Sequence, residues 1–156
     1  MKKLIKKILV PIDGSEHADK ALDYALDLAE KYDASIKILN VVPTPLIPGY
    51  VSPATVGSTP SLPIWAGTYS KELKENSEKM LYKELKEAKK NNPNLKISTK
   101  LLVGQPADKI VETAKEGNFD IIVMGSRGIG GIKEFFLGSV SHGVSNDAEC
   151  PVLIVK

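Results

Sequence analysis

The residues best suited to chemistry are glycines and hydroxyl side chains gathered in one stretch late in the chain. Gly125 and Gly128 flank Arg127, and Gly138 and Ser139 follow. Glycine lets backbone N–H groups come within contact distance of a phosphate, because no Cβ stands in the way. A helix that begins at Ser139 would add unpaired N–H groups and the positive end of its dipole. Two such elements around one loop predict an anion site, better suited to a polyphosphate than to a single phosphate.

The glycine stretch comes directly after residues 120–124, a short apolar run rich in β-branched residues. Such a run is typical of a buried parallel strand. The spacing G-x2-G-x9-G-S, from Gly125 to Ser139, lacks the Gly-Lys-Ser/Thr of a P-loop. It also differs from the G-x-G-x-x-G that follows the first strand of dinucleotide-binding units.

Strands and helices must alternate to position this stretch. Apolar runs predict strands over 7–13, 34–42, 95–103, 120–124 and 152–155, and helical spacing predicts helices over 16–32, 69–91, 106–117 and 139–146. The pattern predicts a single α/β domain over 1–156, a parallel sheet with helices on both faces. Its ligand crevice would lie at the carboxyl ends of the strands. A Pro-rich loop over about 43–68 would cover the ligand or a partner, or simply lie on the surface.

The glycine spacing resembles the ATP-binding signature of the universal stress protein family. Residues 7–15, Lys-Ile-Leu-Val-Pro-Ile-Asp-Gly-Ser, are similar to the first strand and loop of that family. Residues 150–155, Cys-Pro-Val-Leu-Ile-Val, are similar to its last strand. The resemblance implies a Rossmann-like, adenine nucleotide alpha hydrolase-like fold with strand order 3-2-1-4-5. It also implies an ATP-binding protein that acts as a nucleotide-dependent switch in the stress response.

The resemblance also implies which residues meet the nucleotide. The expected set is Pro11, Asp13, Val41, Met124, Gly125, Arg127, Gly128, Gly138, Ser139, Val140 and Ser141. In this set the backbone at Val41 would contact adenine, and the glycine stretch would hold the triphosphate. Asp13 would face the ribose or a Mg²⁺ ion bridging the phosphates, or it would only cap the next helix. Arg127 would bind phosphate oxygens, or it would be a surface charge.

Two other functions stay open. A slow ATP hydrolase or phosphotransferase would need a group that orients the nucleophile, and only Asp13, Ser141 and His142 are candidates. None of them forms a typical catalytic pair, so no catalytic residue is assigned, and His17 is expected on the surface. An ATP-independent dimeric scaffold would instead bind a client protein. ADP, AMP or a cyclic nucleotide would fit the same glycine pattern as ATP.

Composition limits which binding partners and which cellular location we expect for the protein. The 21 basic residues nearly balance the 19 acidic ones, which gives no support to nucleic-acid binding. The sequence shows neither a signal peptide nor a membrane span, and its single cysteine, Cys150, fits a reducing interior, so we expect a cytoplasmic protein. Lysines 2, 3, 6 and 7 form a solvated start or, alternatively, a lipid-touching patch. The last strand, Val152 to Val155, is expected to pair across a homodimer.

Overall fold

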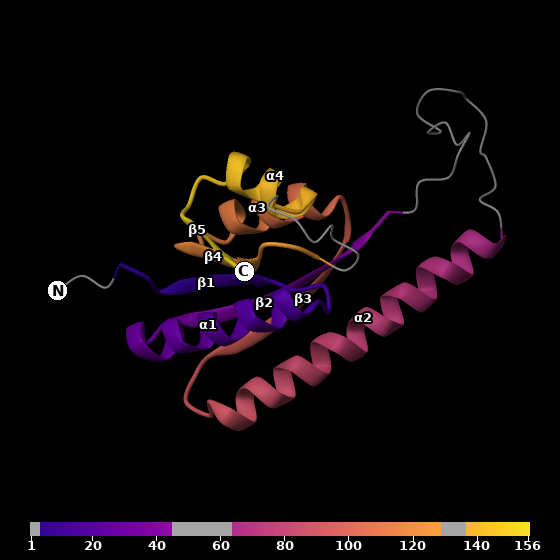
Figure 1. Cartoon of the computed structure of the whole chain (residues 1–156). Helices are drawn as coiled ribbons and strands as arrows, with labels where there is room; N and C mark the ends of the chain where they lie inside the picture. The colour runs from indigo at the N-terminus through magenta and orange to yellow at the C-terminus, as the bar shows by residue number, and fades with distance from the viewer. Residues whose placement is uncertain (1–3, 45–63, 129–136) are drawn as a thin grey trace.

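Five parallel strands and four helices form the described part of the chain (Figure 1). The structure is a computed structural model that describes residues 4–44, 64–128 and 137–156, with only the backbone of residues 64–66. The elements are β1 (Lys7–Pro11), α1 (Glu16–Tyr32), β2 (Ser35–Pro43), α2 (Ile64–Asn91), β3 (Ile97–Gly104), α3 (Pro106–Glu116), β4 (Ile121–Gly125), α4 (Ser139–Asp147) and β5 (Val152–Val155). The strand order β3-β2-β1-β4-β5 confirms the predicted fold.

The helices cover both faces of the sheet. Figure 1 shows α1 and α2 on one face and α3 and α4 on the other. Alternate residues of β1 enter the two layers: Ile8 and Val10 pack with α1, whereas Leu9 packs in the layer that contains Ile110 of α3 and Val144 of α4. Because both faces are buried, the strands read as nearly continuous apolar runs rather than alternating ones.

The order in which successive strands are added to the sheet reverses at β1. β1 pairs with β2 on one side and with β4 on the other, and both pairings are parallel. The connections that leave β1 and β4 therefore run to opposite faces, and a crevice opens at the carboxyl ends of these two strands. The loop after β1 and the loop after β4 meet across it, because the Ser15 hydroxyl donates to the Arg127 carbonyl at 3.4 Å.

Helix α1 has the predicted bounds, and its sequence explains why. Ser15 is its N-cap, and the Ser15 side chain accepts a hydrogen bond from the Ala18 N–H at 3.2 Å. Its buried face is made mostly of alanines: Ala18, Ala21, Ala25 and Ala29. Small side chains let the helix axis approach the sheet closely, so the N-terminus of α1 lies directly beside the crevice.

Some boundaries differ from the sequence prediction. Helix α2 begins at Ile64, not at residue 69, so residues 64–68 are helical and do not belong to the Pro-rich loop. β1 ends at Pro11, two residues earlier than predicted; the Ile12 N–H still donates to the Leu39 carbonyl at 2.8 Å, and Asp13 accepts the Ser15 N–H in the turn before α1. Helix α3 ends at Glu116 with Gly117 as its C-cap, and Asn118 takes the positive φ of 49°.

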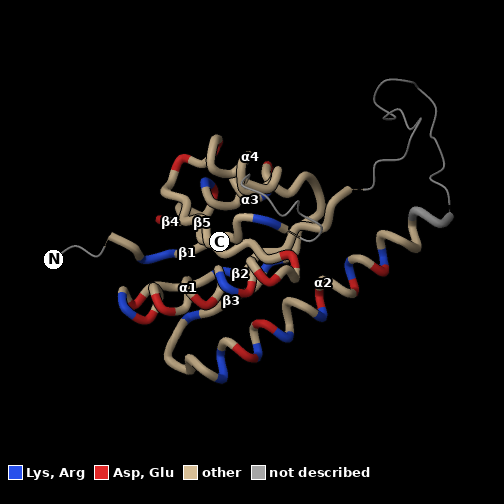
Figure 2. Tube along the Cα trace, viewed as in Figure 1, with Lys and Arg blue, Asp and Glu red and all other residues tan. Residues whose placement is uncertain are grey.

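The first turns of α2 extend beyond the carboxyl ends of the strands, as Figure 1 shows. Its lysines and carboxylates alternate along the exposed sides (Figure 2). Along α2, Leu81 and Ala88 are buried, whereas Leu73 and Ser77 are half-buried. No helix among the described residues is both long enough and apolar enough to cross a bilayer.

Several predictions fall outside the described residues. They concern most of the Pro-rich loop, Lys2 and Lys3, and the aromatic pair Phe135 and Phe136, which the sequence analysis leaves between the two glycine clusters.

Candidate functional site

A cavity of about 540 Å³ opens at the carboxyl ends of β1, β2 and β4. All the residues predicted for the nucleotide site line it: Pro11, Asp13, Val41, Met124, Gly125, Arg127, Gly128, Gly138, Ser139, Val140 and Ser141. They come from four separate segments of the chain. The fold therefore brings together the whole predicted set.

The glycines of this cavity allow close approaches that a side chain would block. A Cβ on Gly128 would lie 2.4 Å from Oδ2 of Asp13, which is far inside contact distance. A Cβ on Gly125 would lie 2.8 Å from the carbonyl carbon and the Cβ of His17. Gly125 therefore lets the N-terminus of α1 pack on the end of β4, and Gly128 lets its loop approach the Asp13 carboxylate.

Asp13 holds the loop that follows β1. Its Oδ1 accepts a hydrogen bond from the Ser15 N–H at 2.9 Å, which is an Asx turn. The capping hydroxyl of α1 belongs to Ser15, so Asp13 is not the helix cap that one interpretation of the sequence proposed. Among the described residues that line the cavity, Asp13 is the one carboxylate.

Arg127 is the one cation among the described residues of the cavity wall. Its side chain is half-buried, and its backbone carbonyl accepts the Ser15 hydroxyl. Arg127 therefore lies where the two loops meet, in the wall of the cavity. A planar cation in that place can bind two oxygens of one phosphate.

Helix α4 presents its N-terminus to the cavity. Gly138 is its N-cap, and the Gly138 N–H donates to the Ser126 carbonyl at 2.8 Å. The N–H groups of the first turn, at Ser139, Val140 and Ser141, have no acceptors within the helix. Ser141 is 2% exposed, and its hydroxyl donates to the Ser126 carbonyl at 2.8 Å. The Ser141 hydroxyl proton is thus already engaged, and its backbone N–H is what it offers an anion.

The backbone of Val41 faces the cavity for a reason set by the sheet. The Leu39 carbonyl accepts the Ile12 N–H at 2.8 Å, so the backbone groups of Leu39 point toward β1. Two residues later, Val41 points its N–H and C=O the same way. β1 ends at Pro11, so these groups of Val41 meet the cavity instead of a strand. A flat polar ring at this place could bind both of them.

Several wall residues were missed by the sequence analysis. Asn40 is 6% exposed; its Nδ2 donates to the Ile12 carbonyl at 2.7 Å, and its buried Oδ1 has no partner among the described residues. A polar residue inside the apolar run 38–42 was the signal that could have found it. Leu73 and Ser77 of α2 also line the cavity. No sequence signal places them there, because their position depends on how far α2 extends past the sheet.

The two histidines lie away from the cavity wall. His142 is exposed, and its Nε2 lies 3.2 Å from Nδ2 of Asn146. His17 is half-buried, not exposed as predicted, because its backbone packs on Gly125. Neither is among the residues that line the cavity. The described residues include no group of three His, Cys, Asp or Glu that could hold a metal ion.

Chemically, the cavity wall offers N–H donors suited to an anion and backbone groups suited to a flat polar ring. A divalent cation would find one carboxylate, Asp13, and would need further oxygen ligands from the bound molecule or water.

Comparison with known proteins identifies the family. Residues 4–156 match the model of the universal stress protein family. The chain is 37% identical to universal stress protein YxiE of Bacillus subtilis over 98% of its own length and 100% of the relative. Universal stress protein UspA from Lactobacillus plantarum shares the fold, with a TM-score of 0.78 at 24% identity, over 97% of this chain and 98% of that one.

A further solved structure was determined with a ligand. It is a universal stress protein in complex with cAMP, 25% identical to this chain, with a TM-score of 0.64 over 98% of both chains. With the whole described fold and the family model in agreement, the chain belongs to the universal stress protein family.

Proposed function

We propose that this protein binds ATP in the cavity at the carboxyl ends of β1, β2 and β4 and acts as a nucleotide-dependent switch in the stress response. The observation that carries the proposal is the tight approach of the Gly128 backbone to the Asp13 carboxylate, where an added Cβ would lie 2.4 Å from Oδ2 and force the carboxylate to move. The cavity wall around this contact offers backbone N–H groups, one carboxylate and one arginine. The cAMP complex of a related universal stress protein supports an adenine nucleotide as the ligand.

The triphosphate would lie between the loop after β4 and the N-terminus of α4. Gly125, Gly128, Gly138, Ser139 and Val140 would donate N–H groups to phosphate oxygens, and Arg127 would add a bidentate cation. Ser141 would contribute its N–H only, since its hydroxyl proton is bound to Ser126.

The base would lie against β2. The N–H and C=O of Val41 match the acceptor and donor on the Watson–Crick edge of adenine, and Pro11 and Met124 would give the ring apolar contacts. Asp13 would accept from a ribose hydroxyl or coordinate a Mg²⁺ ion that the phosphates also hold. The ion would supply charge neutralisation at the phosphates.

Binding without rapid hydrolysis is the expected behaviour. Hydrolysis requires a group that orients water in line with the leaving phosphate. His142 does not line the cavity, and the Ser141 hydroxyl proton is engaged by a backbone carbonyl. Asp13 is then the one candidate left from the sequence analysis, so turnover is expected to be slow at most.

The switch would act through partner surfaces. β5 is an edge strand of the sheet, and Val152, Leu153 and Ile154 are half-buried. We propose that this edge pairs with a second copy to form a homodimer in the cytoplasm, and that nucleotide state changes the affinity for a client protein.

Calorimetric titration with ATP, ADP, AMP and cAMP, each with and without Mg²⁺, tests the proposal. ATP is expected to bind most tightly, with Mg²⁺ improving its affinity and not that of cAMP. The proposal is wrong if none of the four binds. A clear preference for AMP or cAMP would replace ATP by a monophosphate as the ligand.

A further inference from the structure

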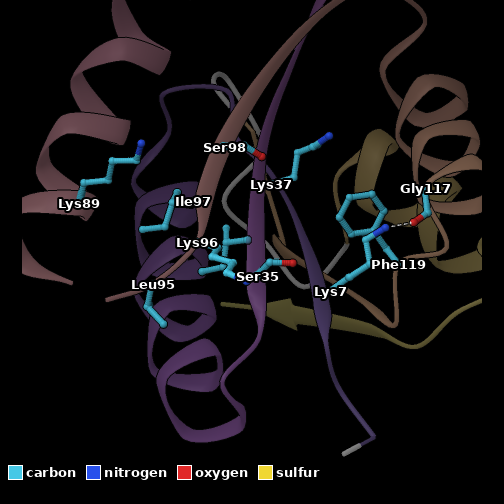
Figure 3. A pocket seen from close by; sticks show the side chains of 11 residues that line it. Lys7, Ser35, Lys37, Lys89, Leu95, Lys96, Ile97, Ser98, Gly117 and Phe119 are labelled. Carbon is cyan, nitrogen blue, oxygen red and sulfur yellow. Dashed lines mark hydrogen bonds between the residues drawn. The ribbon is translucent and has the colours of Figure 1, made fainter. Parts of the chain in front are cut away.

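A second cavity lies at the opposite edge of the sheet, at the amino ends of β1, β2 and β3 (Figure 3). Its volume is about 390 Å³. It is built by the starts of these strands, the last turn of α2 and the loops before β3 and β4. None of its wall residues belongs to the cavity described above.

Lysine dominates the polar part of this wall. Lys7, Lys37, Lys89 and Lys96 line the cavity, and no Asp or Glu is among its described wall residues. This is a local excess in a chain whose charges nearly balance. A cleft lined by one sign of charge on an apolar floor concentrates the opposite ion, because the field is screened less than on an open surface.

The strand register sets two Lys–Ser pairs side by side. Lys7 of β1 is the partner of Ser35 of β2, and Lys37 of β2 is the partner of Ser98 of β3. Since partners on parallel strands point to the same face and residues two apart do likewise, all four share one face of the sheet. The two ammonium groups and the Ser98 hydroxyl there can donate to oxygens of one anion, whereas the Ser35 hydroxyl donates to the Lys6 carbonyl at 3.3 Å.

The lysines differ in how firmly they are held. The Lys7 ammonium donates to the Gly117 carbonyl and lies 5.1 Å from the centre of the Phe119 ring. Lys37, Lys89 and Lys96 form no ion pair within the described parts of the chain. Lys37 of β2 points to the face of the sheet that α3 and α4 cover, whereas Lys89 belongs to α2 on the other face, so the strands lie between them (Figure 3). Lysines that follow the amino edge from one face of the sheet to the other suit an extended anion better than a single small one.

The neighbouring carboxylate is engaged elsewhere. Oδ2 of Asp120 accepts the Lys6 and Lys7 N–H groups at 2.8 and 2.9 Å, which fixes it on the backbone of β1. The Asp120 carboxylate therefore neutralises the lysines at this edge only in part, and Asp120 is not among the residues that line the cavity.

We propose that this cavity is a second ligand site, which binds a soluble anion carrying several linked phosphate groups. Lysine binds phosphate as a point charge, and the Ser98 hydroxyl adds a donor beside the charges. The proposal does not depend on nucleotide binding at the opposite edge. A protein that binds a second phosphate compound there would respond to two metabolites, one at each edge of the same sheet.

Sodium tripolyphosphate is the probe, and the Gly128→Leu variant removes the competing phosphate site. Amide chemical shifts are followed during titration of this variant. Shifts are expected at residues 35–37 and 97–98, and affinity is expected to fall steeply as salt rises. Shifts absent from these residues would overturn the proposal, whatever the outcome of nucleotide titrations of the unmodified protein.

A matched pair of double variants in the same Gly128→Leu background tests the lysines. Lys37→Gln with Lys96→Gln is expected to weaken tripolyphosphate binding by roughly tenfold, as the loss of two partly exposed charges allows. Lys71→Gln with Lys79→Gln removes the same charge from the exposed surface of α2, outside both cavities, and is expected to change affinity less than about twofold. Equal losses in the two doubles, or equal affinity for citrate, would overturn a phosphate site at this edge.

Discussion

Replacing Gly128 by alanine should weaken nucleotide binding through Asp13 and leave the fold intact. The added Cβ would lie 2.4 Å from Oδ2 of Asp13, whereas ordinary contacts begin at 3.4 Å, so the carboxylate must move by about 1 Å. Asp13 can move because its carboxylate ends a short exposed side chain. Gly128 has no positive φ, so alanine is not strained there, and the stability should change by less than ~0.5 kcal/mol.

The expected loss of affinity follows from what the carboxylate does. A hydrogen bond to a charged group contributes ~1.5–3 kcal/mol, so a carboxylate displaced from the ligand should weaken ATP binding by about tenfold or more. Calorimetry measures the affinity, and urea unfolding measures the stability. Gly67→Ala is the matched control, because a Cβ there meets nothing within 4 Å.

A double-mutant cycle separates this cause from others. Once Asp13→Ala has removed the carboxylate, Gly128→Ala has nothing to displace and should cost little further affinity. If Gly128→Ala weakens ATP equally with and without Asp13, the added methyl group acts on the ligand directly. In that case the contact between Gly128 and Asp13 does not explain why glycine is needed.

Three further outcomes are expected. Gly125→Ala should destabilise the fold by ~1–3 kcal/mol in urea unfolding, because its Cβ would lie 2.8 Å from the His17 backbone, which cannot swing away; a value equal to that of Gly67→Ala would contradict this. Burial raises the pKa of the Cys150 thiol, so little thiolate forms near neutral pH, and iodoacetamide should label the folded protein several times more slowly than the urea-unfolded protein. Burial, with repulsion from Asp19 and Glu87, raises the pKa of Glu84. A carboxyl group with a raised pKa in the folded protein lowers the stability of the fold as pH rises through that pKa. Glu84→Gln should therefore raise Tm at neutral pH and not at a pH below the ordinary carboxyl pKa. An equal rise at both pH values would show that the Glu84 charge is not the cause.

The sequence was most informative where local chemistry decides the structure. β-branched runs and the Ser15 cap predict β4 and α1, and glycine spacing predicts the loop that lines the cavity. These features depend only on residues that are neighbours along the chain. The strand order came from the resemblance to the family, because neither hydrophobic period nor turn residues say which strands are adjacent.

The remaining features depend on contacts between distant segments. Leu73 and Ser77 reach the cavity only because α2 is long and starts at Ile64. Asn40 faces the Ile12 carbonyl because the register of β1 and β2 puts them together. The lysines at the amino edge come from separate strands and loops, and a chain with balanced charge gives no sign of them.

The most direct test of the central claim is mass spectrometry of the nucleotide that co-purifies with the protein, compared between the unmodified chain and Gly128→Leu. Intact ATP in the unmodified protein, and none in the variant, is the result we predict. No adenine nucleotide in the unmodified protein, together with no binding of added ATP, would mean that the loop after β4 is only a tight turn.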